Sequence, residues 1–504
     1  MSKTIEMAPG DQHTERLIGH VHPPNWKNPQ PKDRYHLVVI GAGTAGLVSA
    51  IGAAGLGARV ALIERHLMGG DCLNVGCVPS KGVISAARAW HQVRTAAERF
   101  GAPAIDGSGD FAQAMERMRR IRADISKIDG AARFRDAGID VFLGQGQFTG
   151  RNTVEVEGQT LRFRKAVIAT GARATAPPIP GLAEAGYLTN ETLFGLTELP
   201  RRLAILGAGP IGCEMAQSFA RFGTEVTLLD MADHVLIRED ADAAEVVQQA
   251  LIRDGVRLEL GVSITGAKVE GDTKVLEYQR GAATGRAEGD HILVAAGRAP
   301  NLDLGLEAAG VEAHKHGIVV DDRLRTSNPN IFAAGDVASK YQFTHAADAM
   351  ARIVIQNALF FGRKKVSDLV LPWCTYTSPE IAHVGLYEQE AKDQGHEVDT
   401  LTLPLDDVDR ALLDGEEEGF LRVHVKKGTD KVLGATLVAE HAGDMIGELA
   451  LATTAGIGLG TIAGVIHPYP TQGEVVKKIA DQWNRGKLTP TVSKLFNFWF
   501  RLFK

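Results

Sequence analysis

Short apolar runs alternate with glycine-rich turns and small-residue stretches along much of the chain. In residues 35–63, an apolar run precedes a glycine-rich turn, a stretch rich in alanine and glycine, and a second apolar run. Residues 203–229 repeat this order. A short apolar run that ends at turn residues predicts a buried strand, and the small-residue stretch after the turn predicts a helix. The pattern therefore predicts an α/β protein with two units of strand, turn, helix and strand.

The turns in both units have a glycine spacing that suits a dinucleotide. Glycines at the first, third and sixth positions let backbone amides approach a pyrophosphate at the N-terminus of the following helix. Each second strand ends in an acid, Glu64 or Asp230, whose carboxylate can accept hydrogen bonds from ribose hydroxyls. The turn residues that we assign to nucleotide binding are Gly41, Gly43, Gly46, Gly207, Gly209, Ile211 and Gly212.

The two units are related by a constant offset of 166 residues, both between their first glycines and between their acids. A duplicated nucleotide-binding unit predicts that two dinucleotides are held at once. The alternative interpretation is one working site and one decayed copy, but both copies keep every glycine and both acids.

Two of the chain's four cysteines, Cys72 and Cys77, lie five positions apart between Gly69 and Lys81. Residues five apart on an ideal helix project from different faces, and their Cα atoms are too distant for a disulfide. The backbone between them must therefore depart from a regular helix, and Gly76 permits this. Lys81 lies one helical turn after Cys77, and the early turns of a helix stabilise a thiolate. This predicts a redox-active dithiol beside a cation; the alternatives are a structural disulfide and a buried thiol pair.

The composition is that of a soluble protein with more than one domain. The chain has 504 residues, of which 44% are hydrophobic and 23% are charged, and its net charge is −6. This charge gives no indication of nucleic-acid binding, and no Cys/His cluster has zinc-site spacing, so we expect no metal site. Four cysteines with one close pair argue against a secreted disulfide scaffold and favour a cytoplasmic protein, with Cys213 and Cys374 as ordinary buried thiols.

The stretch from Gly69 to Lys81 resembles the active-site segment of the pyridine nucleotide-disulfide oxidoreductases, the family of dihydrolipoamide dehydrogenase, glutathione reductase and mercuric reductase. The resemblance extends over about residues 35–474. It implies that the first unit holds FAD, that the second holds NADH or NADPH, and that the protein is a homodimer. Asp230 favours NADH, because a carboxylate repels the 2′-phosphate of NADPH, although Arg238 would weaken this preference if it folded back.

The resemblance also implies roles for individual residues. Cys77 would face the flavin as a thiolate, and Cys72 would be the interchange thiol that faces the acceptor. Glu214 would pair with Lys81 beside the flavin. The residues assigned to FAD are Gly41, Gly43, Gly46, Glu64, Gly70, Lys81, Gly146, Thr170, Gly171, Gly335, Asp336 and His345. Those assigned to the nicotinamide nucleotide are Gly207, Gly209, Ile211, Gly212, Asp230, Gly297 and Arg298.

The implied fold is α/β, with two Rossmann-like domains and a C-terminal α+β dimerisation domain. Residues 331–336 resemble the family's second FAD motif, so the nicotinamide domain would be inserted within the FAD domain. The expected boundaries are 33–180 and 300–368 for the FAD domain, 181–299 for the nicotinamide domain, 369–485 for the dimerisation domain, 1–32 for a flexible N-terminal arm, and 486–504 for an amphipathic tail.

One position departs from the family pattern. Dihydrolipoamide dehydrogenase and glutathione reductase have a histidine acid/base where this chain has Tyr469, together with a glutamate that matches Glu474. An unperturbed tyrosine, with a pKa of about 10, is a poor base near neutral pH, so dithiol exchange should be handicapped. His467 would replace the base only if its loop were re-aimed.

Mercuric reductases also lack the histidine, so mercuric reductase itself is one alternative activity. Dihydrolipoamide dehydrogenase, which the overall resemblance also implies, is another. Two usual mercuric reductase features have no counterpart in these residues: the N-terminal metal-binding module and the vicinal cysteines near the C-terminus. The expected acceptor is therefore a small one, either a metal ion, a disulfide or a quinone.

The tail, residues 486–504, carries Phe496, Trp499, Phe500 and Phe503 at helical spacing, which predicts a helix with one apolar face flanked by basic residues. This helix is too short to cross a bilayer. Two interpretations stay open: contact with a membrane surface, or docking on its own or the partner subunit. The membrane interpretation leads to a second functional hypothesis, in which the chain is not mainly an enzyme. It would be a flavin-containing binding protein that is recruited to a membrane and has little turnover.

Overall fold

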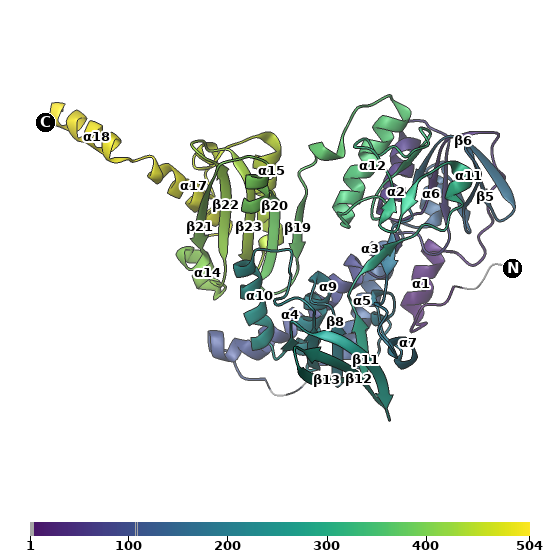
Figure 1. Ribbon diagram of the computed structural model, residues 1–504, viewed down its shortest axis with the longest axis horizontal. Helices are drawn as coiled ribbons and strands as arrows, with labels where there is room; N and C mark the ends of the chain where they lie inside the picture. The colour runs from purple at the N-terminus through teal and green to yellow at the C-terminus, as the bar shows by residue number, and fades with distance from the viewer. Residues whose placement is uncertain (1–4, 106, 108, 504) are drawn as a thin grey trace.

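The computed structural model describes residues 5–105, 107 and 109–503, which form three regions (Figure 1). The first region is built on a seven-stranded sheet in the order β3, β2, β1, β6, β5, β4, with β18 also paired to β6. The strands β1, β2, β3, β6 and β18 are paired in parallel, whereas β4, β5 and β6 are antiparallel. Their bounds are β1 Tyr35–Ile40, β2 Val60–Glu64, β3 Asp140–Leu143, β4 Gln147–Gly150, β5 Thr153–Val156, β6 Gln159–Ile168 and β18 Ile331–Ala333.

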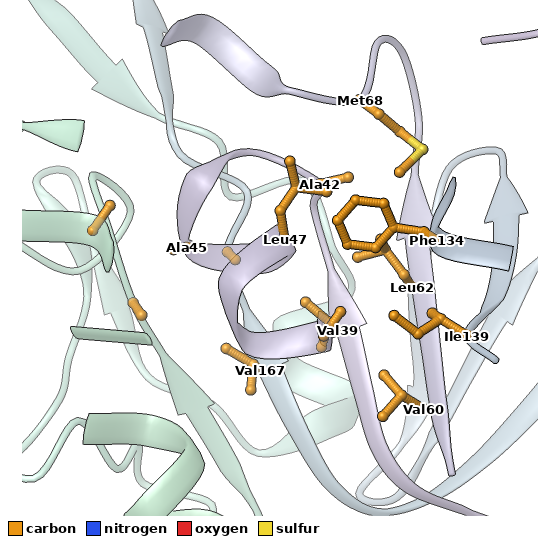
Figure 2. Packing of buried hydrophobic residues seen from close by; sticks show 14 of the residues in the cluster. Val39, Ala42, Ala45, Leu47, Val60, Leu62, Met68, Phe134, Ile139 and Val167 are labelled. Carbon is orange, nitrogen blue, oxygen red and sulfur yellow. The ribbon is translucent and has the colours of Figure 1, made fainter. Parts of the chain in front are cut away.

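Helices of small residues lie close against this sheet. In α2 (Thr44–Gly55), a Cβ added at Gly52 would come within 2.6 Å of Ile355 in α12 (Thr344–Leu359), so the two helices pack without room for a side chain. Figure 2 shows the core between sheet and helices, where Val39, Leu62 and Val167 meet Leu47 and Phe134. The apolar runs and the small-residue stretch in the sequence thus become one buried layer. The other helices of this region are α3 Gly70–Asn74, α4 Cys77–Phe100, α5 Phe111–Ser126, α6 Ala131–Asp136 and α11 Leu306–Ala309.

The second region repeats the parallel unit and is inserted in the first. Its parallel sheet has the order β10, β9, β8, β14 and is accompanied by an antiparallel sheet of β11, β12 and β13. The chain enters this region after β7 (Ala172–Ala174) and leaves it at β15 (Arg298–Pro300), and these two strands pair antiparallel. The remaining bounds are α7 Leu182–Ala185, α8 Asn190–Leu193, β8 Arg202–Leu206, α9 Pro210–Phe222, β9 Glu225–Leu229, α10 Ala241–Arg253, β10 Arg257–Glu259, β11 Ser263–Glu270, β12 Thr273–Arg280, β13 Ala283–Gly289 and β14 His291–Val294.

The third region is an α+β unit with its own core. Five antiparallel strands follow the order β19, β20, β23, β22, β21, and α15 packs against β20 and β23. The bounds are β19 Pro372–Thr375, β20 Glu380–Gly385, α13 Glu388–Asp393, β21 Val398–Pro404, α14 Asp409–Asp414, β22 Phe420–Lys426, β23 Val432–Ala439, α15 Ala442–Ala455, α16 Leu459–Ile462, α17 Glu474–Gly486 and α18 Pro490–Leu502.

The prediction of a flexible N-terminal arm is wrong for its central part. Residues 12–21 form the helix α1 (Gln12–Val21), whose Leu17 and Val21 are fully buried. Asp11 caps this helix by accepting a hydrogen bond from the Thr14 amide at 2.8 Å, and its other carboxylate oxygen pairs with Arg119 of α5 at 2.5 Å. The prolines after residue 22 suggested an irregular segment. The apolar residues of α1, however, are spaced so that they lie on one face, and this face packs on α5.

Candidate redox site

The two glycine-rich turns have nearly identical geometry. Gly41 and Gly207 have φ values of 99° and 109°, which favour glycine. A Cβ added at Gly46 would lie 1.8 Å from the carbonyl oxygen of Gly41, and Gly212 stands in the same relation to Gly207. Each helix therefore starts directly against its turn, which leaves its N-terminal amides facing the space in front of the sheet.

The second glycine of each turn, Gly43 or Gly209, faces the open space in front of the helix. A Cβ added at Gly209 would meet nothing within 4 Å, and one at Gly43 would meet only Gly70, at 3.7 Å. Both residues line the large cavity described below. Gly70 has less room on the side that faces Gly43, since a Cβ added at Gly70 would lie 2.6 Å from the Cα of Gly43. The residues present thus fit a pyrophosphate that approaches the backbone closely.

The acids at the ends of β2 and β9 are also equivalent. Glu64 accepts hydrogen bonds from the amides of Ala42 at 2.7 Å and His66 at 2.8 Å. Asp230 does the same with the amides of Ala208 at 2.6 Å and Ala232 at 2.8 Å. These amides fix each carboxylate beside its turn, where the sequence predicts a ribose.

The backbone between the two cysteines breaks the helix as predicted. Cys72 lies in α3, and α4 begins at Cys77 after Gly76, whose φ of −123° and ψ of −116° lie outside the helical region. This break brings the two thiols close enough for each to shift the pKa of the other. The Cys77 sulfur also lies 3.4 Å from the Thr344 hydroxyl at the start of α12.

The two thiols have opposite acidities. The hydrogen bond from Cys72, the Thr344 hydroxyl and the positive charge of Lys81 together outweigh burial and lower the pKa of Cys77 to about 6. The same hydrogen bond, together with burial, raises the pKa of Cys72. At neutral pH, Cys77 is therefore the thiolate and Cys72 the protonated thiol, because only the first has a pKa below 7.

Lys81 and Glu214 form the ion pair that the resemblance implies. The Lys81 ammonium donates to the two carboxylate oxygens of Glu214 at 3.1 and 3.0 Å. Glu214 is buried in α9 and also accepts a hydrogen bond from the Tyr376 amide at 3.0 Å. The Lys81 ammonium lies 4.3 Å from the centre of the Tyr376 ring, so this pair joins all three regions of the chain.

Sequence reasoning missed Tyr376 and Thr344 as site residues, because no short spacing links either of them to the cysteines. The prediction of buried thiols holds for Cys213, which is fully buried. It is wrong for Cys374, which is only half-buried and lines the cavity beside Tyr376.

One cavity of about 3140 Å³ contains the two turns, the dithiol and the ion pair. A site for one drug-sized ligand has roughly 300–1,000 Å³, so this space suits two dinucleotides rather than one small molecule. The predicted residues that line it are Gly41, Gly43, Glu64, Gly70, Cys72, Cys77, Lys81, Thr170, Gly171, Gly207, Gly209, Ile211, Glu214, Asp230, Gly297, Arg298, Gly335, Asp336 and His345. Gly46 and Gly212 lie behind the turns, and Gly146 lines a small adjoining cavity beside Gly41 and Glu64.

The Arg298 side chain contacts residues on the predicted FAD side of the cavity. It was expected at the nicotinamide nucleotide, but its guanidinium lies 3.5 Å from Asp71 and 3.6 Å from Asp336, two residues on the predicted FAD side. The cause is the pairing of β15 with β7, which turns the chain back towards the first region. The His345 side chain likewise contacts the Pro372 carbonyl at 2.6 Å and joins α12 to β19.

The three predicted acid/base residues lie apart from the dithiol within the described chain. None of Tyr469, His467 and Glu474 lines the cavity. Tyr469 is exposed, and its hydroxyl donates to Asp409 at 3.0 Å, an interaction that raises the tyrosine pKa. His467 contacts Glu448 at 3.0 Å, and Glu474 is the first residue of α17. A role for them in catalysis therefore requires that another subunit approach the dithiol.

Comparisons with known proteins agree with this geometry. The family model for the pyridine nucleotide-disulphide oxidoreductases matches residues 35–351, and the model of their dimerisation domain matches residues 371–480. Mercuric reductase of Bacillus cereus is 38% identical over 454 residues, which cover 88% of this chain and 70% of that protein. Dihydrolipoyl dehydrogenase of Geobacillus stearothermophilus is 34% identical over 88% of this chain and 95% of that protein.

A solved structure points the same way. The HOCl-induced flavoprotein disulfide reductase RclA from Escherichia coli aligns with a TM-score of 0.79 and 31% identity, over 89% of this chain and 99% of that chain. The comparisons confirm the predicted fold class and the predicted cofactors, FAD and NAD(P)H, and the dimerisation domain indicates a homodimer. The helices in the part of the chain that the structure describes are too short or too polar to span a bilayer. The chain belongs to the pyridine nucleotide-disulfide oxidoreductases and is an NAD(P)H-dependent flavoprotein enzyme of that family.

Proposed function

We propose that this enzyme uses NADH to reduce the Cys72–Cys77 pair and that the pair delivers electrons to a small acceptor. The observation that supports this proposal is that the two cysteines, the Lys81–Glu214 ion pair and both nucleotide turns line one cavity. FAD, when bound, supplies the two-electron relay between the nicotinamide nucleotide and the disulfide. The first glycine turn, Glu64 and Asp336 are the groups that would hold it.

The residues around the dithiol have distinct parts in this scheme. Cys77 is held as a thiolate by Cys72, Thr344 and Lys81, so it is the sulfur prepared to face the flavin. Cys72, which keeps its proton in the dithiol form, is the interchange thiol that meets the acceptor. The ammonium of Lys81, fixed by Glu214, places a positive charge where reduction would add negative charge.

Anaerobic titration with NADH tests the scheme directly. A thiolate beside oxidised flavin is expected to give a long-wavelength absorbance band when one equivalent of NADH is added. The band should be absent in Cys77→Ser and should persist in Cys213→Ser, a control at a buried cysteine that does not line the cavity. Failure of NADH to reduce the flavin in the unmodified protein would reject the proposal.

We assign NADH rather than NADPH because of the charge beside the second turn. The Asp230 carboxylate is fixed by two backbone amides, which keeps it pointing at the ribose position. A fixed carboxylate there favours a ribose hydroxyl and repels a phosphate. Arg238 also lines the cavity, so the ratio of kcat/KM for NADH and NADPH is measured in Asp230→Ala and Arg238→Ala. The ratio should fall in the first variant and change little in the second.

The acceptor proposed here is a metal ion, a disulfide or a quinone, with mercuric ion and lipoamide as the alternatives that the named relatives suggest. Tyr469 weakens the case for lipoamide, since its pKa is raised further by Asp409 and it is a poor base. NADH oxidation with a panel of Hg(II), Cu(II), lipoamide, glutathione disulfide and a water-soluble quinone distinguishes these acceptors.

A second candidate function is that of a cytoplasmic flavoprotein that is recruited to a membrane and turns over little. The observation that favours it is α18, which contains no buried residue. Deletion of residues 491–504 separates the two candidates. An intact NADH oxidation rate with lost membrane co-sedimentation supports an enzyme that the tail locates, whereas no rate in either form supports the binding role.

A further inference from the structure

The helix α18 stands away from the rest of the molecule. Figure 1 shows it extending beyond α17 at the end of the third region, opposite the two nucleotide-binding regions. Its neighbour α17 is anchored in that region, because Val475, Val476 and Ile479 are buried in its core. Only the three residues 487–489 separate the two helices. The helix α18 is therefore tethered to the third region at its N-terminal end, and none of its residues is buried.

The side chains of α18 are sorted onto two faces. With 3.6 residues per turn, one half of the helix carries Leu495, Phe496, Trp499, Phe500 and Leu502, and Phe503 follows on the same side. The opposite side carries Ser493, Lys494, Asn497 and Arg501. Phe500 is 65% exposed and Trp499 is 54% exposed, although both belong to residue types that are usually covered.

The charge of this segment is opposite to that of the whole chain. Residues 482–504 contain five lysines and arginines and no acid, whereas the chain has a net charge of −6. Lys494 and Arg501 lie on the polar face of α18, and Lys487 lies 3.5 Å over the ring of Trp483 at the junction with α17. A basic polar face opposite an aromatic face is the pattern of helices that lie in the headgroup region of a bilayer.

We infer that α18 binds the surface of an anionic lipid bilayer, with its aromatic face at the boundary of headgroups and acyl chains and with Lys494 and Arg501 at the lipid phosphates. This inference makes the second candidate function more specific by naming the kind of membrane. It rests on the proposed function only in taking the protein that α18 brings to the membrane to be an active flavoenzyme.

The width of the apolar face favours a bilayer over a groove on a second copy of the chain. A helix that docks in a groove buries a stripe of three or four residues per two turns. The apolar residues of α18 cover about half of its circumference, and Phe498 extends them further. An isolated helix of 13 residues is also marginal in water, so it needs an environment that covers this surface as a whole.

Co-sedimentation with vesicles tests the inference with the full-length, FAD-loaded protein. Vesicles of phosphatidylcholine mixed with phosphatidylglycerol should bind at least about tenfold more protein than vesicles of phosphatidylcholine alone. The double variant Trp499→Ser, Phe500→Ser should reduce this binding about tenfold or more. Lys494→Glu with Arg501→Glu should abolish the preference for the anionic vesicles. The matched control Phe361→Ser, Leu413→Ser removes two apolar side chains elsewhere that are at least as exposed, and it should leave binding unchanged.

Three outcomes would overturn the inference. One is equal binding to both kinds of vesicle, and another is unchanged binding in the Trp499 and Phe500 variant. The third is a change of oligomeric state in that variant, measured by light scattering without lipid, which would assign the aromatic face to a second copy of the chain. NADH oxidation is measured in the same samples. Protein that sediments but does not oxidise NADH would count against the proposed function and not against the membrane contact.

Discussion

Replacing Lys81 by glutamine tests the role of the ion pair most directly. The Lys81 ammonium lies 3.0 and 3.1 Å from the two oxygens of Glu214. At an effective dielectric constant of about 20, this attraction is worth about 5 kcal/mol before solvent screening. The effect of the Lys81 charge on a developing negative charge nearby is a separate interaction, and because the side chain is 37% exposed, solvent screening reduces it to about 1–2 kcal/mol.

This energy predicts a defined loss of rate. Stopped-flow measurement of flavin reduction by NADH should give a rate constant about 5- to 30-fold lower in Lys81→Gln than in the unmodified enzyme, because 1.4 kcal/mol corresponds to a factor of ten. The variant also leaves the buried Glu214 without its cation, which the double variant Lys81→Gln, Glu214→Gln relieves. The double variant should therefore regain thermal stability without regaining the rate.

The control is Lys268→Gln, which breaks an ion pair with Glu277 at 2.5 Å on the antiparallel sheet of the second region, outside the cavity. Its rate should equal that of the unmodified enzyme. The reasoning would be refuted if Lys81→Gln reduced the flavin at the normal rate, or if the double variant regained the rate together with its stability.

Three further predictions follow from the geometry. An alanine at Gly46 or at Gly212 would place its Cβ 1.8 Å from a carbonyl oxygen. Gly46→Ala should therefore lose bound FAD, measured by the flavin absorbance of the purified protein, and Gly212→Ala should bind NADH more weakly, measured by the KM for NADH. The long-wavelength band should fade as the pH falls through about 6, the pKa of Cys77, because the thiolate is protonated below that value, and Thr344→Val should move this midpoint to higher pH. Tyr469→His should raise lipoamide turnover at pH 7 by about tenfold or more if a partner subunit brings this position to the dithiol, and unchanged turnover would show that it does not.

The parts of the site that lie close together in sequence could be predicted from the sequence. The turn glycines, their acids and the break between Cys72 and Cys77 follow from short spacings, because local backbone geometry decides them. The Lys81 and Glu214 pair was identified only through the family resemblance, since 133 residues separate its members.

Contacts made by tertiary packing could not be predicted in the same way. Tyr376 directly follows β19 and Thr344 begins α12, and no spacing in the sequence connects either of them to the site. Arg298 follows a strand that resembles the end of a nucleotide domain, but the crossing of β15 and β7 sends its side chain to Asp336. The helix α1 was missed because its partner, α5, lies about a hundred residues later in the chain.

The backbone contact between Gly43 and Gly70 has a consequence for engineering this enzyme. The thiol loop rests on the first glycine turn with no side chain between them, since a Cβ at Gly70 would lie 2.6 Å from the Cα of Gly43. The positions of the two segments therefore depend on each other, although 27 positions separate Gly43 from Gly70 in the sequence. A chimera that takes the cysteine segment from a relative, but keeps the glycine turn of this chain, is expected to misplace the two sulfur atoms. Exchange of residues 35–81 as one block is expected to keep them in position.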